Sequence, residues 1–291
     1  MPEQPPAAGV AAVVLTWRDR AQTAECVRTL LRSPLIGRIV VVDNEADGTI
    51  AAALPSDARI EVHEIAANTG FAGGVNVGLK TVLDDPTTRL VLAVNNDATL
   101  SPDSLAALVA ALEGDPELSM VAPGISTPEG ERSTAGGVVN RITWSIREPR
   151  PGERPDYLTW ACVLVRPEVF ATVGLLDERF FMYWEDVEFA LRMTDHGLRF
   201  AEVPEAVLVH AVSSSHSRAG SRVLAYSSEA FRHFLRLRGG RTTVLGLGRL
   251  ATKVLVTAAT GDLRGARYVV AGWRIGRRAP DPAYPALARL P

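Results

Sequence analysis

The sequence has few cysteines, no long apolar run and little net charge. Its 291 residues include two cysteines, Cys26 and Cys162, which excludes a disulfide framework and a cysteine-rich metal site and favours a reducing, cytoplasmic location. No segment reaches about 18 uninterrupted apolar residues, so no membrane span is expected. The start of the chain has no basic, apolar targeting pattern, and we expect residues 1–9 to be a disordered N-terminus.

The net charge of −2 conceals an uneven distribution. From Arg218 to Arg278 there are 13 Lys or Arg and only two Asp or Glu, so the tail is basic and the body is acidic. Apolar residues recur between these charges and predict a basic helical extension over residues 218–291. Such an extension can be a solvated surface, or it can lie on an anionic membrane, and both interpretations stay open. No nucleic-acid partner is expected.

The first hundred residues alternate between apolar runs and helical patterns. Strands are predicted at residues 10–16, 39–42 and 60–65 and in the run that ends at Asp97, with helical spacing between them. This alternation predicts an α/β fold, with a Rossmann-like, mostly parallel central sheet flanked by helices.

The pattern changes after a helix predicted at residues 102–112. Residues 119–165 contain short runs separated by Gly and Pro, the clearest being a strand at 157–165, and they predict an antiparallel or mixed insertion over the ligand edge of the sheet. A helix near residues 184–194 and an extended segment at 199–210 follow. The next segment is polar and ends at Arg218, whose charge could close over an anionic ligand.

Polar residues follow two of the predicted strands. Asn95, Asn96 and Asp97 end an apolar run, and Asp43 ends another, which places them at the edge where open α/β sheets bind ligands. A carboxylate at Asp97 could hold a metal ion, although the same three residues could form a simple turn. Asp43 could accept hydrogen bonds from a ribose or a base, or it could cap a helix.

A glycine-rich segment runs from Asn68 to Gly78. Its spacing fits neither the dinucleotide fingerprint nor the P-loop. Glycines allow close approach of a ligand to the backbone at a helix start, and they also allow a helix to pack closely on a sheet. Asn68 and Asn76 favour ligand contact, because a packing loop does not need two amides.

Acidic residues beside large aromatic residues form a second candidate cluster. Glu185, Asp186 and Glu188 follow the run Phe180–Trp184, and they could simply stabilise the first turn of a helix. Aromatic surroundings also raise the proton affinity of a carboxylate, so Asp186 is a candidate general base. His210, at the end of a predicted strand, is either structural or a nitrogen ligand that complements Asp97.

Together these segments resemble the inverting, nucleotide-sugar-dependent glycosyltransferases of family 2, which have the GT-A fold. Four motifs match in order over residues 10–212: Thr16-Trp17 with Val42-Asp43-Asn44, the segment Asn68–Gly78, the DXD variant Asn95-Asn96-Asp97, and Gly174–Asp186 with Arg192. The match is most similar to rhamnosyltransferase-like and galactofuranosyltransferase-like members that build bacterial cell-surface glycans. Two positions depart from the family pattern: Asn95 replaces the first acid of DXD, and Trp17-Arg18 replaces Tyr-Asn.

The resemblance implies a role for each matching position. Thr16, Asp43 and Asn44 would hold the nucleoside, and Asn68, Gly70, Phe71 and Asn76 would line the nucleotide and sugar pocket. Asp97 would bind Mg²⁺ or Mn²⁺ at the donor diphosphate, with Asn96 beside it and His210 completing the metal ligands. Asp186 would be the catalytic base, and Glu185 and Trp184 would shape the acceptor site.

The resemblance also implies domains, partners and a reaction. Residues 10–217 would form the GT-A domain, with a nucleotide-binding half at 10–100 and an acceptor-binding half at 101–217. The donor would be a dTDP- or UDP-sugar, with rhamnose a candidate, and the acceptor a glycan, a lipid-linked sugar or a small molecule. Transfer would be an in-line displacement, in the cytoplasm or on the inner face of the membrane. A sugar nucleotidyltransferase and a non-catalytic sugar-binding protein are the alternative interpretations.

Overall fold

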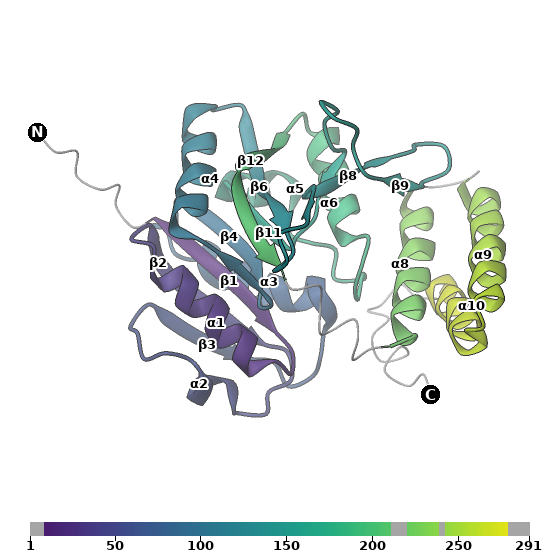
Figure 1. Ribbon diagram of the computed structural model, residues 1–291, viewed down its shortest axis with the longest axis horizontal. Coiled ribbons are helices and arrows are strands. Elements are labelled where there is room, and N and C mark those ends of the chain that lie inside the picture. Colours follow the sequence, from purple (N-terminus) through teal and green to yellow (C-terminus); the bar gives the residue numbers. More distant parts are fainter. Residues whose placement is uncertain (1–8, 211–219, 239–241, 279–291) are drawn as a thin grey trace, which may run out of the picture.

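The computed structural model describes residues 9–210, 220–238 and 242–278. The expected disordered N-terminus, apart from Gly9, lies outside the described residues, and so does Arg218. Within them the chain forms one large sheet, helices on both of its faces, a small second sheet and three C-terminal helices (Figure 1).

Four parallel strands form the first half of the large sheet, as predicted. They are β1 (Val10–Thr16), β2 (Ile36–Asp43), β3 (Ile60–Glu64) and β4 (Leu90–Asn95), in the order β3-β2-β1-β4. Thr16 pairs with Asp43, and Leu15 pairs with Asn95, so the carboxyl ends of these strands meet at one edge of the sheet. That edge is where the sequence places its candidate ligand-binding residues.

The second half of the sheet is mixed. It contains β11 (Cys162–Val165), β6 (Leu118–Ser126), β12 (Arg199–His210) and β5 (Ala98–Leu100), with β7 (Arg132–Ser133) beside β6. Strand β11 runs antiparallel between β4 and β6, and β12 runs parallel to β6. In addition, β5 pairs antiparallel with β12, which places His210 opposite Ala98 and next to the turn that contains Asp97.

The prediction for residues 119–165 is therefore correct only in part. Strands β6 and β11 belong to the large sheet and not to an insertion, because their apolar side chains are buried on both of its faces. A small antiparallel sheet contains β8 (Gly136–Val139), β9 (Ile146–Arg147) and β10 (Tyr157–Leu158). The single strand predicted at 157–165 is divided between the two sheets, at Thr159–Ala161.

Alternation along each strand creates two separate cores. Val10, Ala12 and Val14 face one core, and Ala11 and Val13 face the other. The first core is covered by α1 (Arg20–Leu31), α2 (Ile50–Ala53) and α4 (Pro102–Gly114). The second is covered by α3 (Gly70–Leu83), α5 (Pro167–Val173) and α6 (Glu185–Asp195). The helix predicted from Pro102 is confirmed, and the Ser101 side chain caps it by accepting a hydrogen bond from the Ser104 N–H.

Both cysteines are free and buried in the first core. Burial raises the pKa of the Cys26 thiol to about 12 and the pKa of the Cys162 thiol above its ordinary value as well. Each thiol therefore stays protonated at neutral pH, which argues against a nucleophilic role for either one.

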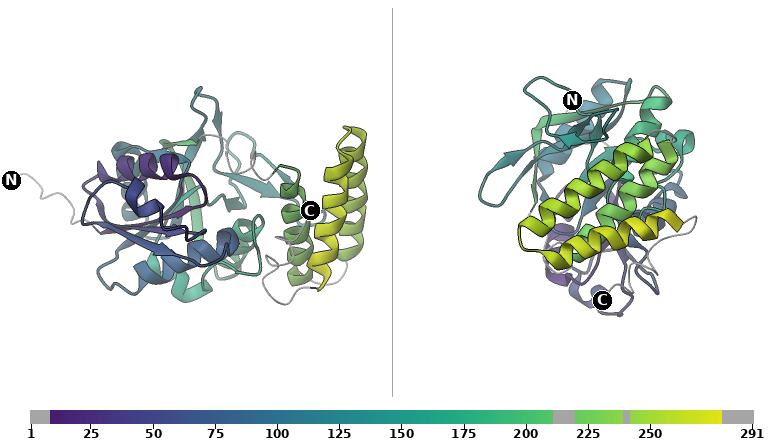
Figure 2. Two further views of the ribbon diagram at one scale, coloured as in Figure 1. Left: turned by 90° about the horizontal axis from the view of Figure 1, so that it is seen from below. Right: turned by 90° about the vertical axis from the view of Figure 1, so that its right-hand side faces the viewer.

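The basic tail is helical, as predicted. It forms α8 (Arg222–Arg238), α9 (Thr242–Ala259) and α10 (Leu263–Arg278), which lie together at one end of the molecule (Figures 1 and 2). Helices α8 and α10 pack closely, since a Cβ atom at Gly272 would collide with the backbone of Ala225. In the described parts of the chain, no helix combines the length and apolar character needed to cross a membrane.

Helix α8 joins this group of helices to the rest of the protein. Phe231 and Phe234 pack on Trp184, with ring centroids 4.8 Å apart in both pairs, and Phe234 also meets Trp144 edge-on at 5.0 Å. These residues belong to one buried cluster with Val187 and other residues of α6, the helix that begins at the candidate acids. The extension therefore shares a hydrophobic core with the segment that carries Asp186.

A buried carboxyl in this extension has no visible partner. Glu229 on α8 is fully buried, and neither of its carboxylate oxygens accepts a hydrogen bond within the described residues. Burial raises the pKa of Glu229 from 4.5 to about 8. Folding therefore favours the protonated acid, and this contribution to stability is present below pH 4.5 and lost as the pH rises through about 8.

The variant Glu229→Gln should thus become more stable relative to the wild type as the pH is raised from 5 to 8. The amide cannot ionise, so it avoids the growing cost of a buried charge, and each kcal/mol gained should raise Tm by about 2–4 °C. Thermal unfolding of both proteins across this pH range measures the difference. Glu168→Gln, which removes an exposed carboxyl on α5, is the control. A Tm difference that does not change with pH would contradict the assignment.

Candidate active site

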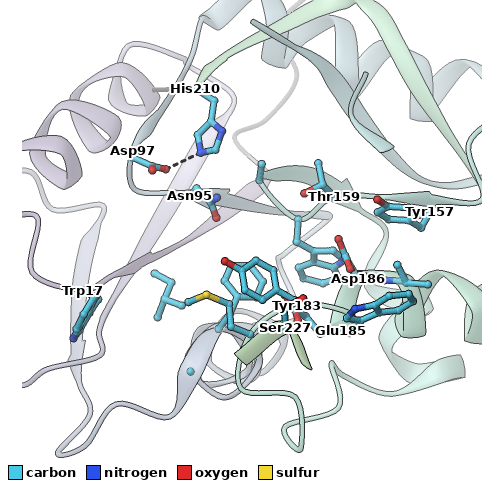
Figure 3. A pocket seen from close by; sticks show the side chains of 18 of the residues that line it. Trp17, Asn95, Asp97, Tyr157, Thr159, Tyr183, Glu185, Asp186, His210 and Ser227 are labelled. Atoms are coloured by element: carbon cyan, nitrogen blue, oxygen red, sulfur yellow. Dashed lines mark hydrogen bonds and ion pairs between the residues drawn. The ribbon is translucent and has the colours of Figure 1, made fainter. Parts of the chain in front are cut away.

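One pocket of about 600 Å³ opens at the carboxyl edge of the sheet. It extends from β1 and the start of α3, across the ends of β4 and β12, to α6 and the C-terminal helices. Figure 3 shows Trp17 on one side, Tyr157 and Asp186 on the other, and Asp97 with His210 between them. Of the residues expected in a site, ten line this pocket: Asn44, Asn68, Gly70, Phe71, Asn96, Asp97, Trp184, Glu185, Asp186 and His210.

Asp97 and His210 contact each other in this pocket. The His210 Nε2 lies 2.9 Å from the Asp97 Oδ1, and the two side chains are 18% and 6% exposed (Figure 3). Asp97 lies in the tight turn between β4 and β5, and His210 ends β12 beside β5. The turn expected from the sequence therefore forms at Asn96 and Asp97, and it presents a carboxylate to the pocket. A metal ion at Asp97 stays a prediction.

A hydrogen-bond network fixes the loop before α3. The Asn44 side chain donates to Asn68 Oδ1 at 3.0 Å and to the Gly70 carbonyl at 2.9 Å, and it accepts from the Thr69 N–H at 2.9 Å. The Gly70 and Phe71 N–H groups donate to Asn68 Oδ1 and to the Phe181 carbonyl. These first N–H groups of α3 are therefore already bonded, and the amides shape the pocket wall.

The glycines of residues 68–78 are needed for two different structural reasons. Gly70 has φ of +78°, and a Cβ atom there would collide with the Phe181 carbonyl. Gly74 and Gly78 instead face Leu15 and Val13 of β1, where a side chain would separate helix from sheet. Only the start of the segment touches the pocket, and the remainder is a close helix–sheet contact.

A strained turn aims the acidic pair at the pocket. Tyr183 and Trp184 have φ of 76° and 69°, in the left-handed region that residues other than glycine rarely adopt. Helix α6 starts immediately afterwards, so Glu185 and Asp186 lie in its first turn and line the pocket. Strained backbone of this kind is concentrated at functional sites, where the surrounding packing maintains it.

Burial makes both acids weaker. It raises the pKa of Asp186 to about 6, although the Val187 N–H, 2.7 Å from the Asp186 Oδ1, opposes the rise. Burial and the neighbouring Asp186 charge raise the pKa of Glu185 well above its ordinary value. The pair therefore holds a proton more tightly than free carboxyl groups do, which suits Asp186 to accept a proton.

Thr16, Asp43 and Asn76 do not line this pocket. Thr16 is buried and its hydroxyl lies 2.7 Å from the Thr23 hydroxyl, and Asp43 accepts a hydrogen bond from the Glu45 N–H. Asn76 is buried and exchanges hydrogen bonds with the backbone of Leu176 at 2.8 and 3.2 Å, so it ties α3 to the segment before α6. All three are buried away from the pocket surface.

The sequence patterns did not indicate a functional role for several residues that line the pocket. Tyr157 and Thr159 come from the divided strand, and Ser227 and Arg249 come from α8 and α9. Tyr183 is in the aromatic run that the sequence singled out, but nothing in the run distinguished it. Burial raises the pKa of Tyr157 above its ordinary value, and so does the Asp186 charge, so the phenol stays a hydrogen-bond donor.

Asp97 and His210 together fit a divalent cation that is bound along with a substrate. No cluster of three or more His, Cys, Asp or Glu capable of holding a metal occurs among the described residues. Asp97 and His210 supply one carboxylate and one imidazole facing the same space. A hard divalent cation commonly combines one or two protein ligands with substrate phosphate oxygens, so this pair suits an ion shared with a diphosphate.

Comparison with known proteins identifies the family. Residues 5–236 match the model of "Glycosyltransferase like family 2", and because this is most of the chain, the protein belongs to that family. The chain is 26% identical over 186 residues to the low-salt glycan biosynthesis hexosyltransferase Agl10 of Haloferax volcanii, covering 60% of this chain and 59% of that relative. It is 28% identical over 230 residues to an N-acetylglucosaminyl-diphospho-decaprenol L-rhamnosyltransferase of Mycobacterium tuberculosis, covering 68% and 74%.

The comparison with solved structures confirms the GT-A fold. The mannosyltransferase PcManGT of Pyrobaculum calidifontis, solved with GDP-mannose and Mn²⁺, aligns with a TM-score of 0.56 and 16% identity. The alignment covers 96% of this chain and 83% of that one. At this identity the likeness defines the fold alone.

Proposed function

We propose that the protein is an inverting, metal-assisted glycosyltransferase that moves a sugar from a nucleoside-diphosphate sugar to an acceptor hydroxyl. One observation carries the proposal: a single pocket contains the Asp97–His210 pair and a carboxylate of raised pKa, Asp186. The first fits a diphosphate with its cation, and the second fits a proton acceptor. Membership of the family supports the same reaction.

The donor occupies the β1–β4 side of the pocket in this proposal. Trp17 offers an aromatic face to a nucleoside base, and the Asn44–Asn68 network holds the wall beside it. The relative from Mycobacterium tuberculosis is named as an L-rhamnosyltransferase, which supports rhamnose as the sugar. We propose dTDP or UDP as its carrier. Thr16, Asp43 and Asn76 support this wall from behind.

The reaction is one displacement at the anomeric carbon. The acceptor oxygen forms a bond to that carbon while the bond to the diphosphate oxygen breaks on the opposite face, so the configuration inverts. Asp186 accepts the proton of the acceptor hydroxyl, and the burial that raises its pKa strengthens it as a base. A divalent cation bound at Asp97 and His210 would neutralise charge on the departing diphosphate.

The variant Asp186→Asn should lower kcat by about 10²–10⁴-fold, because the amide cannot accept the proton. Binding of the nucleoside diphosphate should be unchanged, because Asp186 does not face that side of the pocket. Product release from a panel of dTDP-, UDP- and GDP-sugars measures turnover, and calorimetry measures binding.

Asp195→Asn, at the other end of α6, is the matched control and should keep full activity. The wild-type kcat/KM should also fall as the pH drops through about 6, where Asp186 becomes protonated. Equal activity of Asp186→Asn and the wild type would remove Asp186 as the base. No turnover of any donor by the wild type would favour a binding protein.

The variant Asp97→Ala should weaken metal-dependent binding of a nucleoside diphosphate by at least about tenfold, since it removes the charged ligand. Titration of UDP, dTDP and GDP into the protein, with Mn²⁺ or with EDTA, measures this directly. The variant with Mn²⁺ should behave like the wild type with EDTA. Asp103→Ala, an exposed aspartate on α4, should bind like the wild type. Metal-independent binding by the wild type would contradict the metal role.

The C-terminal helices suit peripheral contact with an anionic membrane. Leu255 and Val256 on α9 and Leu263 on α10 are 69%, 56% and 64% exposed, and the three helices carry many Arg residues. Apolar side chains among basic ones are typical of helices that lie in the membrane interface. A lipid-linked acceptor would then reach the pocket from the membrane. The cytoplasmic location expected from the cysteine content stays a prediction.

The double variant Leu255→Glu/Val256→Glu should lose binding to vesicles of phosphatidylcholine and phosphatidylglycerol, because it places two carboxylates on the contact surface. Co-flotation with these vesicles measures binding, and high salt should weaken that of the wild type. Ala106→Glu/Ala110→Glu adds the same charge on α4, at the other end of the molecule (Figure 1), and should float like the wild type. No flotation of the wild type would leave the extension as a solvated surface.

A further inference from the structure

Arg249 is a cation that the C-terminal helices place in the wall of the pocket. It is on α9, more than 60 residues beyond Asp186, yet both residues line the same pocket. Its guanidinium carbon lies 4.4 Å from the centroid of the Phe231 ring and 5.9 Å from that of Trp184. Because Trp184 directly precedes Glu185, these contacts place Arg249 at the acceptor end of the pocket.

Arg249 has no carboxylate partner among the described residues. Its recorded hydrogen bonds use one nitrogen, Nη1, which donates to the Trp144 carbonyl and, at 3.5 Å, to the Thr143 carbonyl. Burial alone lowers the pKa of Arg249, with no acid to offset it. A guanidinium has five N–H groups, so Nε and Nη2 keep donors for a ligand.

A second polar group from the extension lines the same pocket. Ser227 on α8 lines the pocket, and its hydroxyl has no recorded hydrogen bond within the described residues. The planar fork of an arginine matches a phosphate group, and a nearby hydroxyl can donate to the same oxygens. A neutral sugar would leave the charge of Arg249 unmatched.

The surface beyond Arg249 favours a hydrocarbon chain. Lys253 is one helical turn further along the same side of α9 and is exposed, and Val256 follows it at the next turn. Leu255 and Leu263 lie exposed beyond them. A group attached to a phosphate at Arg249 would therefore lie on a basic and apolar surface. Such a surface suits a prenyl chain and does not suit a soluble glycan.

We propose that Arg249 binds a phosphate of the acceptor, and that the acceptor is a sugar joined through phosphate or diphosphate to a prenyl chain. The proposal rests on the glycosyltransferase function above, but binding can be tested without turnover. Farnesyl diphosphate is the probe, with farnesol and inorganic pyrophosphate as the two partial probes. EDTA is present throughout, so that metal-dependent binding of diphosphate beside Asp97 does not contribute.

The wild type should bind farnesyl diphosphate more tightly than either partial probe. Arg249→Met should weaken that binding about 10- to 100-fold, the range expected for a charge-assisted contact, and should leave farnesol binding unchanged. Arg249→Lys keeps the charge and should retain more affinity than Arg249→Met. Arg232→Met is the matched control, because Arg232 also lies over an aromatic ring, 4.5 Å from Trp273, but does not line the pocket.

A purely structural role for Arg249 gives a different result. Arg249 ties the turn at Trp144 to α9, so loss of that contact alone would lower Tm and weaken every ligand equally. Binding of a nucleoside diphosphate with Mn²⁺ should therefore stay intact in Arg249→Met. Equal loss of both ligands, unchanged farnesyl diphosphate binding, or pyrophosphate binding as tight as farnesyl diphosphate would each overturn the proposal. Donor hydrolysis by the wild type tests the glycosyltransferase function separately.

Discussion

The packing of Trp184 against the C-terminal helices is the contact on which the acidic side of the pocket depends. Left-handed backbone at Tyr183 and Trp184 costs about 1–3 kcal/mol per residue, so the surrounding structure must hold it in place. Phe231 and Phe234 of α8 supply that packing at 4.8 Å, and aromatic pairs contribute about 0.5–1.5 kcal/mol each beyond burial. The direction in which Glu185 and Asp186 point is therefore fixed by a distant part of the chain.

The same aromatic cluster sets the electrostatics of the two ends of the pocket. Around Glu185 and Asp186 the rings exclude water, and the resulting low dielectric raises both pKa values. At the other end, Asp97 faces an imidazole and lies among amide side chains, which is a polar environment. One end is thus suited to move a proton and the other to hold charge, although each has a carboxylate at its centre.

The sequence predicted the parts of the site that are local. Asp97 follows a buried strand, the loop at Asn68 precedes a helix, and Asp186 begins one, so apolar period and flanking polar residues were enough to find them. Thr16 and Asp43 also end strands, but a strand end has two sides, and the pattern does not say which side chain reaches the surface. Asn76 lies in the second turn of α3, where its side chain faces Leu176 and not the pocket.

The parts that the sequence did not predict depend on contacts between distant segments. The division of residues 157–165 between two sheets follows from the pairing of β11 with β4 and of β10 with β8, which no local pattern encodes. Arg249 and Ser227 reach the pocket only because α8 packs on Trp184. The sequence predicted that the tail is helical and basic. It did not decide whether the basic side chains face solvent, and only the tertiary structure shows Arg249 at the pocket.

The two sides of the pocket, proposed for the donor and for the acceptor, differ in the same way. The side of the pocket that we propose for the donor is built from consecutive strand–helix units, β1 to β4 with α1 and α3. The acceptor side combines α6, the small sheet and the C-terminal helices, which meet through packing of side chains such as Trp144, Trp184 and Phe234. Changes in α8 and α9 can therefore alter this end of the pocket without disturbing the β1–β4 edge, so under the proposed function the extension is placed to determine which acceptor binds.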